Sequence, residues 1–209
     1  MRKTLRTTAA NIRKAATATR SRIRATIAAA ALLAGVSAAA AGDLACEREM
    51  ARASAESGVP LNVLYSVGLT ETGNRGELGA YDMNVDGRAV HSITLSEALA
   101  RFAVAKAHGA RFIDIGCMQI NERFHGMRFP SPAAMFDPHR NVDYAAAFLK
   151  GLKAEQGSWT LAVARYNAGP NNPAAQHTYV CAVIRNLVAS GFGRWTANAR
   201  ALCPQTAAR

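Results

Sequence analysis

The sequence lacks the spacings that mark a metal site. It has no Cys-x-x-Cys or His-x-x-x-His pair, and its five histidines are scattered. It also lacks internal repeats, and its N-terminal apolar run is shorter than the roughly 20 residues that a membrane-spanning helix needs. We therefore expect no metal and no cofactor. With 209 residues and 50% hydrophobic content, the chain suffices for one globular core but hardly for two.

Basic residues gather at the N-terminus, where eight of them precede the first acidic residue, Asp43. Without those eight, the formal net charge falls from +11 to +3, which leaves no basic stripe for nucleic acid. An apolar stretch (25–36) and small residues ending in Ala-x-Ala follow this arm, an order typical of a secretory signal peptide. We predict a signal peptide over 1–41 with cleavage near 39–41, export to the periplasm, and no membrane span afterwards. The alternative is a retained basic arm that binds nucleic acid or anionic lipid.

Helix signals dominate the remaining chain, because capping residues or prolines open the segments and glycines close them. Residues 81–91, with Asp86-Gly87 between two short mixed segments, predict instead an irregular β-hairpin or extended loop. The expected fold class is therefore α-rich (α+β), a single domain with one small β excursion. The helices are expected over 43–57, 61–72, 94–108, 137–157, 158–168 and 172–190.

Glu71 lies near the end of the predicted helix 61–72. At about 100° per residue, it falls within about 20° of Leu64 and about 60° of Gly68, so its carboxylate shares their face. Burial on that face and the negative end of the helix dipole both raise the pKa of the carboxyl. A proton then stays available near neutral pH, as a general acid requires. Taken alone, the helix fits a surface glutamate at a frayed end better.

Two motifs downstream carry polar side chains suited to sugars. Residues 116–121 read Gly-Cys-Met-Gln-Ile-Asn, in which the amides of Gln119 and Asn121 suit sugar hydroxyls and N-acetyl groups. Residues 164–170 read Ala-Arg-Tyr-Asn-Ala-Gly-Pro and place Tyr166 and Asn167 at the end of a helix, where a phenol and an amide can project into a cleft. Each motif alone fits a buried turn, or core packing with a helix cap, equally well or better.

The ordered set of these motifs resembles the bacterial lytic transglycosylases of the goose-lysozyme-like superfamily, with an SLT-type catalytic domain. The set comprises Glu-Thr-Gly at 71–73, the two motifs above, and Tyr-Val at 179–180. The resemblance covers roughly 44–190 and is closest to small single-domain members that accompany secretion, conjugation or flagellar machinery in the envelope. It implies a lysozyme-like catalytic domain over 42–195, followed by a C-terminal tail over 196–209.

By this resemblance, the substrate is peptidoglycan and the bond cleaved is the β-1,4 bond between N-acetylmuramic acid and N-acetylglucosamine. Glu71 would protonate the glycosidic oxygen and then deprotonate the muramoyl C6 hydroxyl, closing a 1,6-anhydro ring without water. Tyr166 and Asn167 would hold Glu71 and the N-acetyl group. The remaining implied substrate-binding positions are Met118, which would support the cleft floor, Gln119, Asn121 and Tyr179.

Three positions depart from the family pattern. Thr72 stands where serine commonly follows the glutamate, and it keeps the hydroxyl. Cys117 stands where leucine is usual, which allows a covalent bond to hold the motif in place of packing. Arg165 stands where alanine usually precedes the Tyr-Asn pair, as a solvated residue or as a contact for an anionic peptide stem.

The four cysteines all follow the predicted cleavage site, and an even number in an exported chain suggests disulfides. Three pairings are possible, and buried free thiols are a further alternative. We favour Cys46 with Cys203, which would fasten the two ends of the domain, and Cys117 with Cys181.

Two other functions compete with the transglycosylase. A hydrolytic muramidase of the same superfamily would need a second carboxylate to activate water, for which Asp82, Asp86 and Asp114 are candidates. A glycan-binding or assembly module would keep the fold without catalysis, which the presence of Glu71 together with its supporting motifs disfavours.

Overall fold

The computed structural model describes residues 44–72 and 78–204. The predicted signal peptide (1–41), residue 43 of the first predicted helix and Gly73 of the Glu-Thr-Gly motif lie outside the described residues.

Helices account for most of the described chain, which confirms the predicted α-rich (α+β) class. None of the helices within these residues is long and apolar enough to cross a membrane. The helices are α2 (Ala45–Ser57), α3 (Leu61–Glu71), α4 (Leu95–Ala107), α5 (Glu122–His125), the 3-10 turn η1 (Gly126–Arg128), α6 (Pro132–Phe136), α7 (Pro138–Gln156), α8 (Trp159–Ala168), α9 (Pro173–Ala189) and α10 (Ala197–Leu202).

Local capping explains where the longer helices begin and end. At four of them, the predicted N-cap side chain accepts a hydrogen bond from the backbone N–H three residues further on, which satisfies one of the unpaired donors of the first turn. Gly58 and Gly157 end α2 and α7 in the left-handed conformation, with φ of 76° and 80°, which a residue with a Cβ adopts at a cost. The four capping residues are Thr94, Asp137, Ser158 and Asn172.

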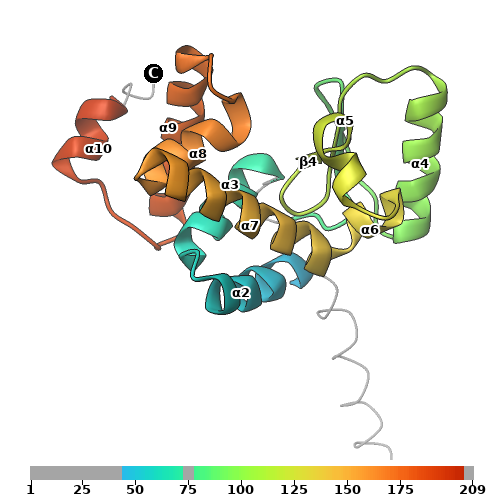
Figure 1. Ribbon diagram of the computed structural model, residues 1–209, viewed down its shortest axis with the longest axis horizontal. Helices are drawn as coiled ribbons and strands as arrows, with labels where there is room; N and C mark the ends of the chain where they lie inside the picture. Colours follow the sequence, from blue (N-terminus) through green and yellow to red (C-terminus); the bar gives the residue numbers. More distant parts are fainter. Residues whose placement is uncertain (1–43, 73–77, 205–209) are drawn as a thin grey trace, which may run out of the picture. The chain divides into compact units, whose positions relative to one another are not determined.

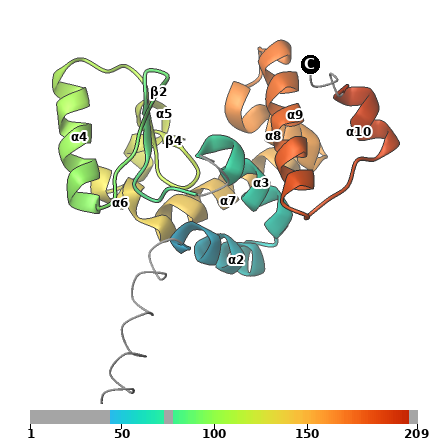
Figure 2. The ribbon, with the colours of Figure 1, turned by 180° about the vertical axis from the view of Figure 1, so that it is seen from behind.

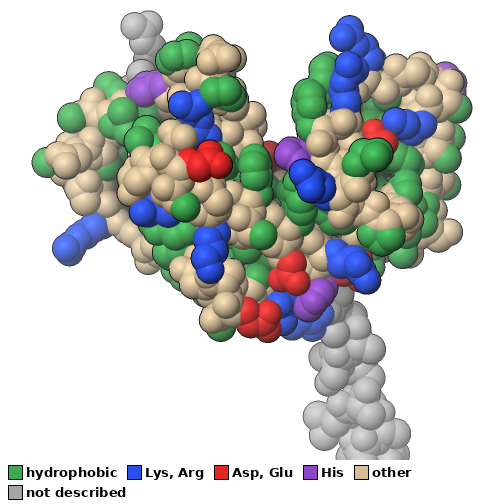
Figure 3. All heavy atoms as spheres, in the orientation of Figure 1, with side chains coloured by type: hydrophobic (Ala, Val, Ile, Leu, Met, Phe, Trp, Pro, Cys, Tyr) green, Lys and Arg blue, Asp and Glu red, His purple; other side chains and the backbone are tan. Residues whose placement is uncertain are grey.

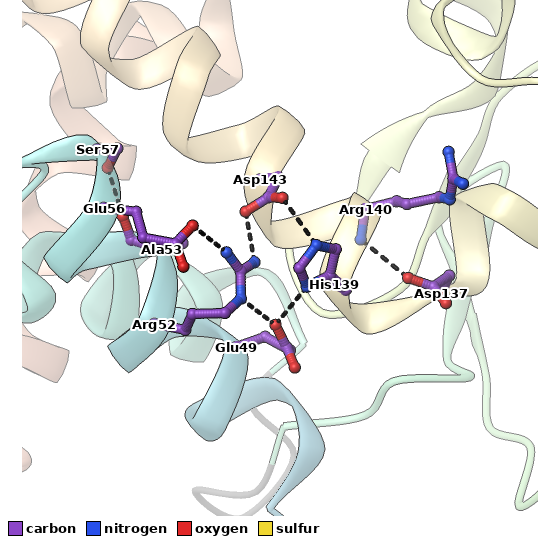
Figure 4. A network of polar contacts seen from close by, with 9 residues as sticks. All are labelled: Glu49, Arg52, Ala53, Glu56, Ser57, Asp137, His139, Arg140 and Asp143. Carbon is purple, nitrogen blue, oxygen red and sulfur yellow. Dashed lines mark hydrogen bonds and ion pairs between the residues drawn. The ribbon is translucent and has the colours of Figure 1, made fainter.

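The long helix α7 packs against α2 and α8, while α9 packs against α3 and α8 (Figure 1). A charged network fastens α2 to α7 on their solvent side (Figure 4). The guanidinium of Arg52 donates to Glu49 at 2.7 Å, to Glu56 at 2.6 Å and to Asp143 at 2.5 Å. His139 lies 3.0 Å from Glu49 through Nδ1. The network therefore joins two helices whose apolar faces already meet in the core.

The sheet contains four short antiparallel strands in the order β2-β1-β3-β4. The predicted hairpin is confirmed as β1 (Met83–Val85) and β2 (Arg88–Val90) around Asp86-Gly87. The strands β3 (Ile113–Ile115) and β4 (Ile120–Asn121) were not predicted, because three and two residues are too few to show alternation. Helices α4, α5 and α6 lie on the same side of the molecule as this sheet in both ribbon views (Figure 2).

One hydrophobic core runs from the helices into the sheet. Its largest fully buried side chains come from both regions, so neither has a separate core. They include Met50, Leu64, Met83, Ile113, Ile115, Met118, Phe136 and Leu149.

Both disulfides differ from the predicted pairing, which was wrong. Cys46 of α2 is bonded to Cys117, and Cys181 of α9 to Cys203, each with a Cα–Cα separation of 5.5 Å. A disulfide needs two Cα atoms within about 7 Å, and folding brings Cys117 to the first turn of α2 rather than to α9. The segment predicted as a tail is thus tethered to α9, not to the start of the domain.

Candidate active site

A pocket of about 290 Å³ lies between the helical region and the sheet region. In Figure 3 the surface is hollowed between the side formed by α8 and α9 and the side that carries α5 and α4. Glu71 enters the pocket from the end of α3, Asp114 from β3, and Tyr166 and Asn167 from α8. Of the residues implied as substrate-binding, Gln119, Asn121, Tyr166 and Asn167 line this pocket with Glu71.

Glu71 is the last residue of α3, and its side chain is partly buried at the pocket. The Tyr179 hydroxyl donates a hydrogen bond to Glu71 Oε1. Burial raises the pKa of the Glu71 carboxyl to about 7, against the hydrogen bond from Tyr179, which lowers it, and with the charge of Asp114, which raises it further. The raised pKa keeps the protonated carboxyl available near neutral pH, in the direction predicted from its position on the helix.

The two pocket tyrosines have different partners. Tyr179 is 7% exposed and holds Glu71, whereas the Tyr166 hydroxyl donates to the Met118 carbonyl at 2.8 Å. The role of holding Glu71, which the resemblance implied for Tyr166, thus falls to Tyr179. Burial raises the pKa of both phenols well above the usual value, so both stay protonated and act as donors.

A buried asparagine supports the turn that carries Gln119. Asn141 of α7 is fully buried; its Nδ2 donates to the carbonyls of Ile115 and Met135 at 2.8 Å each, and its Oδ1 accepts from the Met118 N–H at 2.9 Å. Gly116 has a φ of 76°, and a Cβ there would lie 2.8 Å from Asn141 Nδ2. The glycine of the motif is therefore required both by conformation and by space. Sequence reasoning missed Asn141, whose one signal is a polar residue beside the apolar positions of α7.

The amides of the motif are largely occupied by the protein itself. Gln119 Nε2 donates to the Gly116 carbonyl at 2.9 Å and to the Asp82 carbonyl at 3.2 Å. Asn121 donates to Asp114 at 2.6 Å and accepts from the N–H of Arg123. Gln119 Oε1 accepts no hydrogen bond from residues 44–72 or 78–204, so it remains an acceptor for a ligand in the pocket.

The remaining implied residues occupy different surroundings. The Met118 side chain is fully buried and does not line the pocket, and its support of the cleft floor stays a prediction. Asn167 is exposed at the pocket, whereas Arg165 does not line it. Thr72 is buried, and its hydroxyl donates to the Gly68 carbonyl at 3.2 Å. Thr72 therefore caps α3 directly after Glu71.

Of the three candidate second carboxylates, only Asp114 shares the pocket with Glu71. Asp82 Oδ2 lies 2.9 Å from His91 Nδ1, and Asp82 Oδ1 accepts from the Ser92 N–H. Asp86 accepts from the backbone N–H groups of 111 and 112, which fixes the turn. Burial raises the pKa of Asp114, and the hydrogen bond from Asn121 opposes this.

Aromatic residues that sequence reasoning missed form much of the pocket wall. Phe112 and Phe124 are 38% and 67% exposed, with ring centroids 6.1 Å apart. His125 lies 2.7 Å from the Tyr144 hydroxyl, and burial lowers its pKa, which favours the neutral ring. Phe148 of α7 packs between His125 and Tyr166. No local pattern distinguishes these residues, because they become neighbours only through folding.

Over 44–72 and 78–204, no group of three or more histidine, cysteine, aspartate or glutamate side chains could hold a metal ion. The pocket presents Glu71, beside its donor Tyr179, and a polar rim formed by Asp114, Gln119 and Asn121.

Comparison with known proteins gives one match. Residues 81–184 match the model of the transglycosylase SLT domain family. No curated protein and no solved structure matches the chain significantly. The matched segment contains the polar rim and Tyr179, while Glu71 precedes it by ten residues. The chain therefore belongs to the transglycosylase SLT domain family, with an SLT-type lytic transglycosylase catalytic domain.

Proposed function

We propose that this protein cleaves the β-1,4 bond between N-acetylmuramic acid and N-acetylglucosamine in peptidoglycan without water, leaving 1,6-anhydromuramoyl ends. Membership of the SLT family supports a lytic-transglycosylase-type action on peptidoglycan. The observation that carries the finer proposal is Glu71, a carboxyl in the pocket with its pKa raised to about 7.

One carboxyl group performs both proton transfers in this reaction. Protonated Glu71 gives its proton to the glycosidic oxygen as the C1–O bond breaks, which leaves the N-acetylglucosamine hydroxyl and a cationic muramoyl C1. The Glu71 carboxylate then takes the proton of the C6 hydroxyl as its oxygen bonds to C1. A pKa near the working pH suits both the acid and the base step, and Glu71 ends protonated, ready for the next turnover.

The surroundings of Glu71 fit this cycle. The hydrogen bond from Tyr179 stabilises the carboxylate that forms after the first step, while burial keeps the ground state available as an acid. Gln119 Oε1 and Asn167 lie in the same pocket and offer an acceptor and an amide to the sugar's hydroxyl and N-acetyl groups.

The family's substrate implies an extracytoplasmic location. We propose that residues 1–41 act as a secretory signal, that 42–195 form the catalytic domain in the periplasm, and that 196–209 form a tail. The disulfide between Cys181 and Cys203 fits an oxidising compartment. An envelope-spanning secretion, conjugation or flagellar machine is the proposed partner, which pull-down from envelope fractions tests.

Hydrolysis is the second candidate, because Asp114 lies in the Glu71 pocket and its charge raises the pKa of Glu71. A water activated by Asp114 would give reducing ends in place of anhydro ends. The proportion of the two products in a digest of purified sacculi decides between them. Mass spectrometry of muropeptides should show anhydro ends; reducing ends alone would establish the hydrolase.

Substitution separates Glu71 from other carboxylates. We expect Glu71→Gln to lower cleavage at least about a thousandfold, because the amide cannot transfer a proton. Its oxygen can still accept from Tyr179, so the fold and glycan binding should persist. The matched control is Glu155→Gln, the same change at an exposed position of α7, which should leave activity unchanged. Substantial activity in Glu71→Gln would remove Glu71 from this role.

A further inference from the structure

A second groove, of about 710 Å³, lies beside the Glu71 pocket and is rimmed by basic side chains. It is formed between the end of α4, α5, η1 and the start of α6. The two cavities share two stretches of backbone. At 111–112 the arginine lines the groove and the phenylalanine lines the pocket, and at 123–124 the same alternation recurs. The pocket and the groove are therefore separated by a single step along the chain at each of these two stretches.

Two guanidinium groups converge on one aromatic ring at this boundary. The Cζ of Arg111 lies 5.7 Å, and that of Arg123 5.5 Å, from the centroid of the Phe112 ring. Neither arginine forms an ion pair with any residue in the part of the chain that the structure describes. The attraction of the ring face holds both cations near it although they repel each other.

The groove's own carboxylate is already neutralised. Glu122 accepts from Lys106 Nζ at 2.9 and 3.2 Å, so this lysine and this glutamate balance each other. Arg111 and Arg123 therefore bring two guanidinium groups without ion pairs to the described residues to the junction of groove and pocket, where the nearby Asp86 carboxylate is bound by the backbone N–H groups of 111 and 112. Both arginines are exposed, and each guanidinium presents N–H donors in a fork that matches a carboxylate.

The ring between the two arginines also belongs to the pocket. Phe112 and Phe124 form an exposed aromatic pair on the wall that contains Glu71, where their faces can cover the C–H face of a sugar. An aromatic wall followed immediately by two cations fits a ligand in which an anionic group is attached to a neutral sugar.

We propose that Arg111 and Arg123 bind carboxylates of the peptide stem carried by the glycan strand in the Glu71 pocket, so that the preferred substrate is peptidoglycan with intact stems. The inference rests on the proposed function, because the muramoyl residue carries the stem. Arg165, the stem contact considered from the sequence, lines neither cavity.

Binding to two forms of the glycan tests this site separately from catalysis. Purified sacculi, freed of attached wall polymers, are used intact, or an amidase removes the stems and the soluble glycan strands so released, which keep their lactyl carboxylates, are coupled through their ends to beads. Binding of the full chain carrying Glu71→Gln is measured by co-sedimentation with the sacculi or with the beads. We expect binding to intact sacculi to be about tenfold tighter than to stripped glycan, as for one or two partly exposed ion pairs. Added salt should weaken the difference.

In the background of Glu71→Gln, the pair Arg111→Gln and Arg123→Gln should abolish the preference for intact stems and leave binding to stripped glycan unchanged. The conservative pair Arg111→Lys and Arg123→Lys keeps the charge without the fork and should retain part of the preference. The matched control is Arg88→Gln with Arg194→Gln, two exposed arginines outside both cavities, which removes the same charge. The proposal would be overturned if this control lost the preference for intact stems to the same extent, or if Arg111→Gln with Arg123→Gln kept the preference undiminished.

Competition identifies the anion that the site takes. A soluble stem peptide should displace the protein from intact sacculi at concentrations at which inorganic phosphate does not. Equal competition by phosphate would overturn the assignment to stem carboxylates. Product analysis with active protein remains a separate measurement: the stem preference without any anhydro product would refute the proposed function and leave the stem site standing. Anhydro products without a stem preference would overturn the stem site and leave the proposed function standing.

Discussion

The helical region and the sheet region of this domain contribute to the active site in different ways. The helices supply the acid, since Glu71 ends α3 and its donor Tyr179 comes from α9. The sheet and the turn between β3 and β4 supply Asp114, Gln119 and Asn121, and the amide N–H groups of Gln119 and Asn121 donate to acceptors within the protein. The reactive group therefore lies on regular helices, and the polar rim lies on short strands that need support from elsewhere.

Three links across the boundary provide this support. They are the disulfide between Cys46 and Cys117, the hydrogen bonds of Asn141, and the bond from the Tyr166 hydroxyl to the Met118 carbonyl. All three meet in the turn over 116–118. The position of the motif therefore depends on the helices beneath it more than on its own strands.

Breaking the boundary disulfide should have the largest effect. We expect Cys46→Ala with Cys117→Ala to lower the free energy of unfolding by about 4 kcal/mol, because the bond closes a loop of 71 residues. Activity should fall as well, since the turn that carries Gln119 loses its covalent link to α2. Denaturant unfolding together with sacculus digestion measures both.

The disulfide of the C-terminal segment is the comparison for this change. Cys181→Ala with Cys203→Ala opens a loop of 22 residues, so we expect a loss of about 3 kcal/mol without a change in activity at temperatures where the protein is folded. Equal losses of activity from both pairs would contradict the boundary role of Cys46 and Cys117.

Removing the buried amide should come next in size. Asn141→Ala leaves the carbonyls of Ile115 and Met135 and the N–H of Met118 without this partner, and we expect a loss of about 3 kcal/mol. Thermal or denaturant unfolding gives the value. Asn198→Ala, the same change at an exposed position of α10, should stay within about 0.5 kcal/mol of the parent. A small effect of Asn141→Ala would show that the turn holds its shape unaided.

The raised pKa of Glu71 makes stability depend on pH. Its folded pKa of about 7 exceeds the unfolded value of 4.5, so its contribution is fully present below pH 4.5 and is lost as the pH rises through about 7. The full shift corresponds to about 3 kcal/mol, which partial exposure reduces to about 2 kcal/mol. We therefore expect the free energy of unfolding of Glu71→Gln to rise by about 2 kcal/mol relative to that of the parent as the pH goes from 4 to 8.5.

Unfolding of both proteins by denaturant at the two pH values measures this difference. Glu155→Gln, at an exposed position, should track the parent at both. If the free energies of unfolding of Glu71→Gln and the parent differed by the same amount at both pH values, the Glu71 pKa would be the same in the folded and unfolded chain.

Replacing either of the two pocket tyrosines by phenylalanine should have the smallest effect, and the two replacements should differ. Tyr179→Phe removes the hydrogen bond that stabilises the Glu71 carboxylate, so the Glu71 pKa should rise further. Because the first step needs protonated Glu71, the decrease of kcat/KM with rising pH should occur at a higher pH than in the parent. The maximal kcat/KM should be about tenfold lower, because the base step loses the stabilised carboxylate. Tyr166→Phe removes only a bond to the Met118 carbonyl and should leave the position of this fall unchanged. Identical pH profiles for both variants would contradict the assignment of Tyr179 to Glu71.

Helix positions and the acid could be predicted from the sequence, whereas the surroundings of the acid could not. The predicted helix ends at Gly157 and the caps at Thr94, Asp137 and Ser158 agree with the structure, because capping acts between residues three or four apart. The pairing of cysteines was wrong. The strands β3 and β4 and the helices α5, α6 and α10 were missed, because short elements carry little periodicity.

The helix that ends at Glu71, the polar motifs that follow it in order and the family, that of the transglycosylase SLT domain, could all be recognised without a structure. The hydrogen bond from Tyr179, 108 residues away, to Glu71 and the position of Asn141 under the turn of Gly116 became known only from the folded chain. The two kinds of feature differ in the range of the interactions that produce them. Capping and helix periodicity act within one or two turns of the chain, but hydrogen bonds across a pocket exist only once the core has packed.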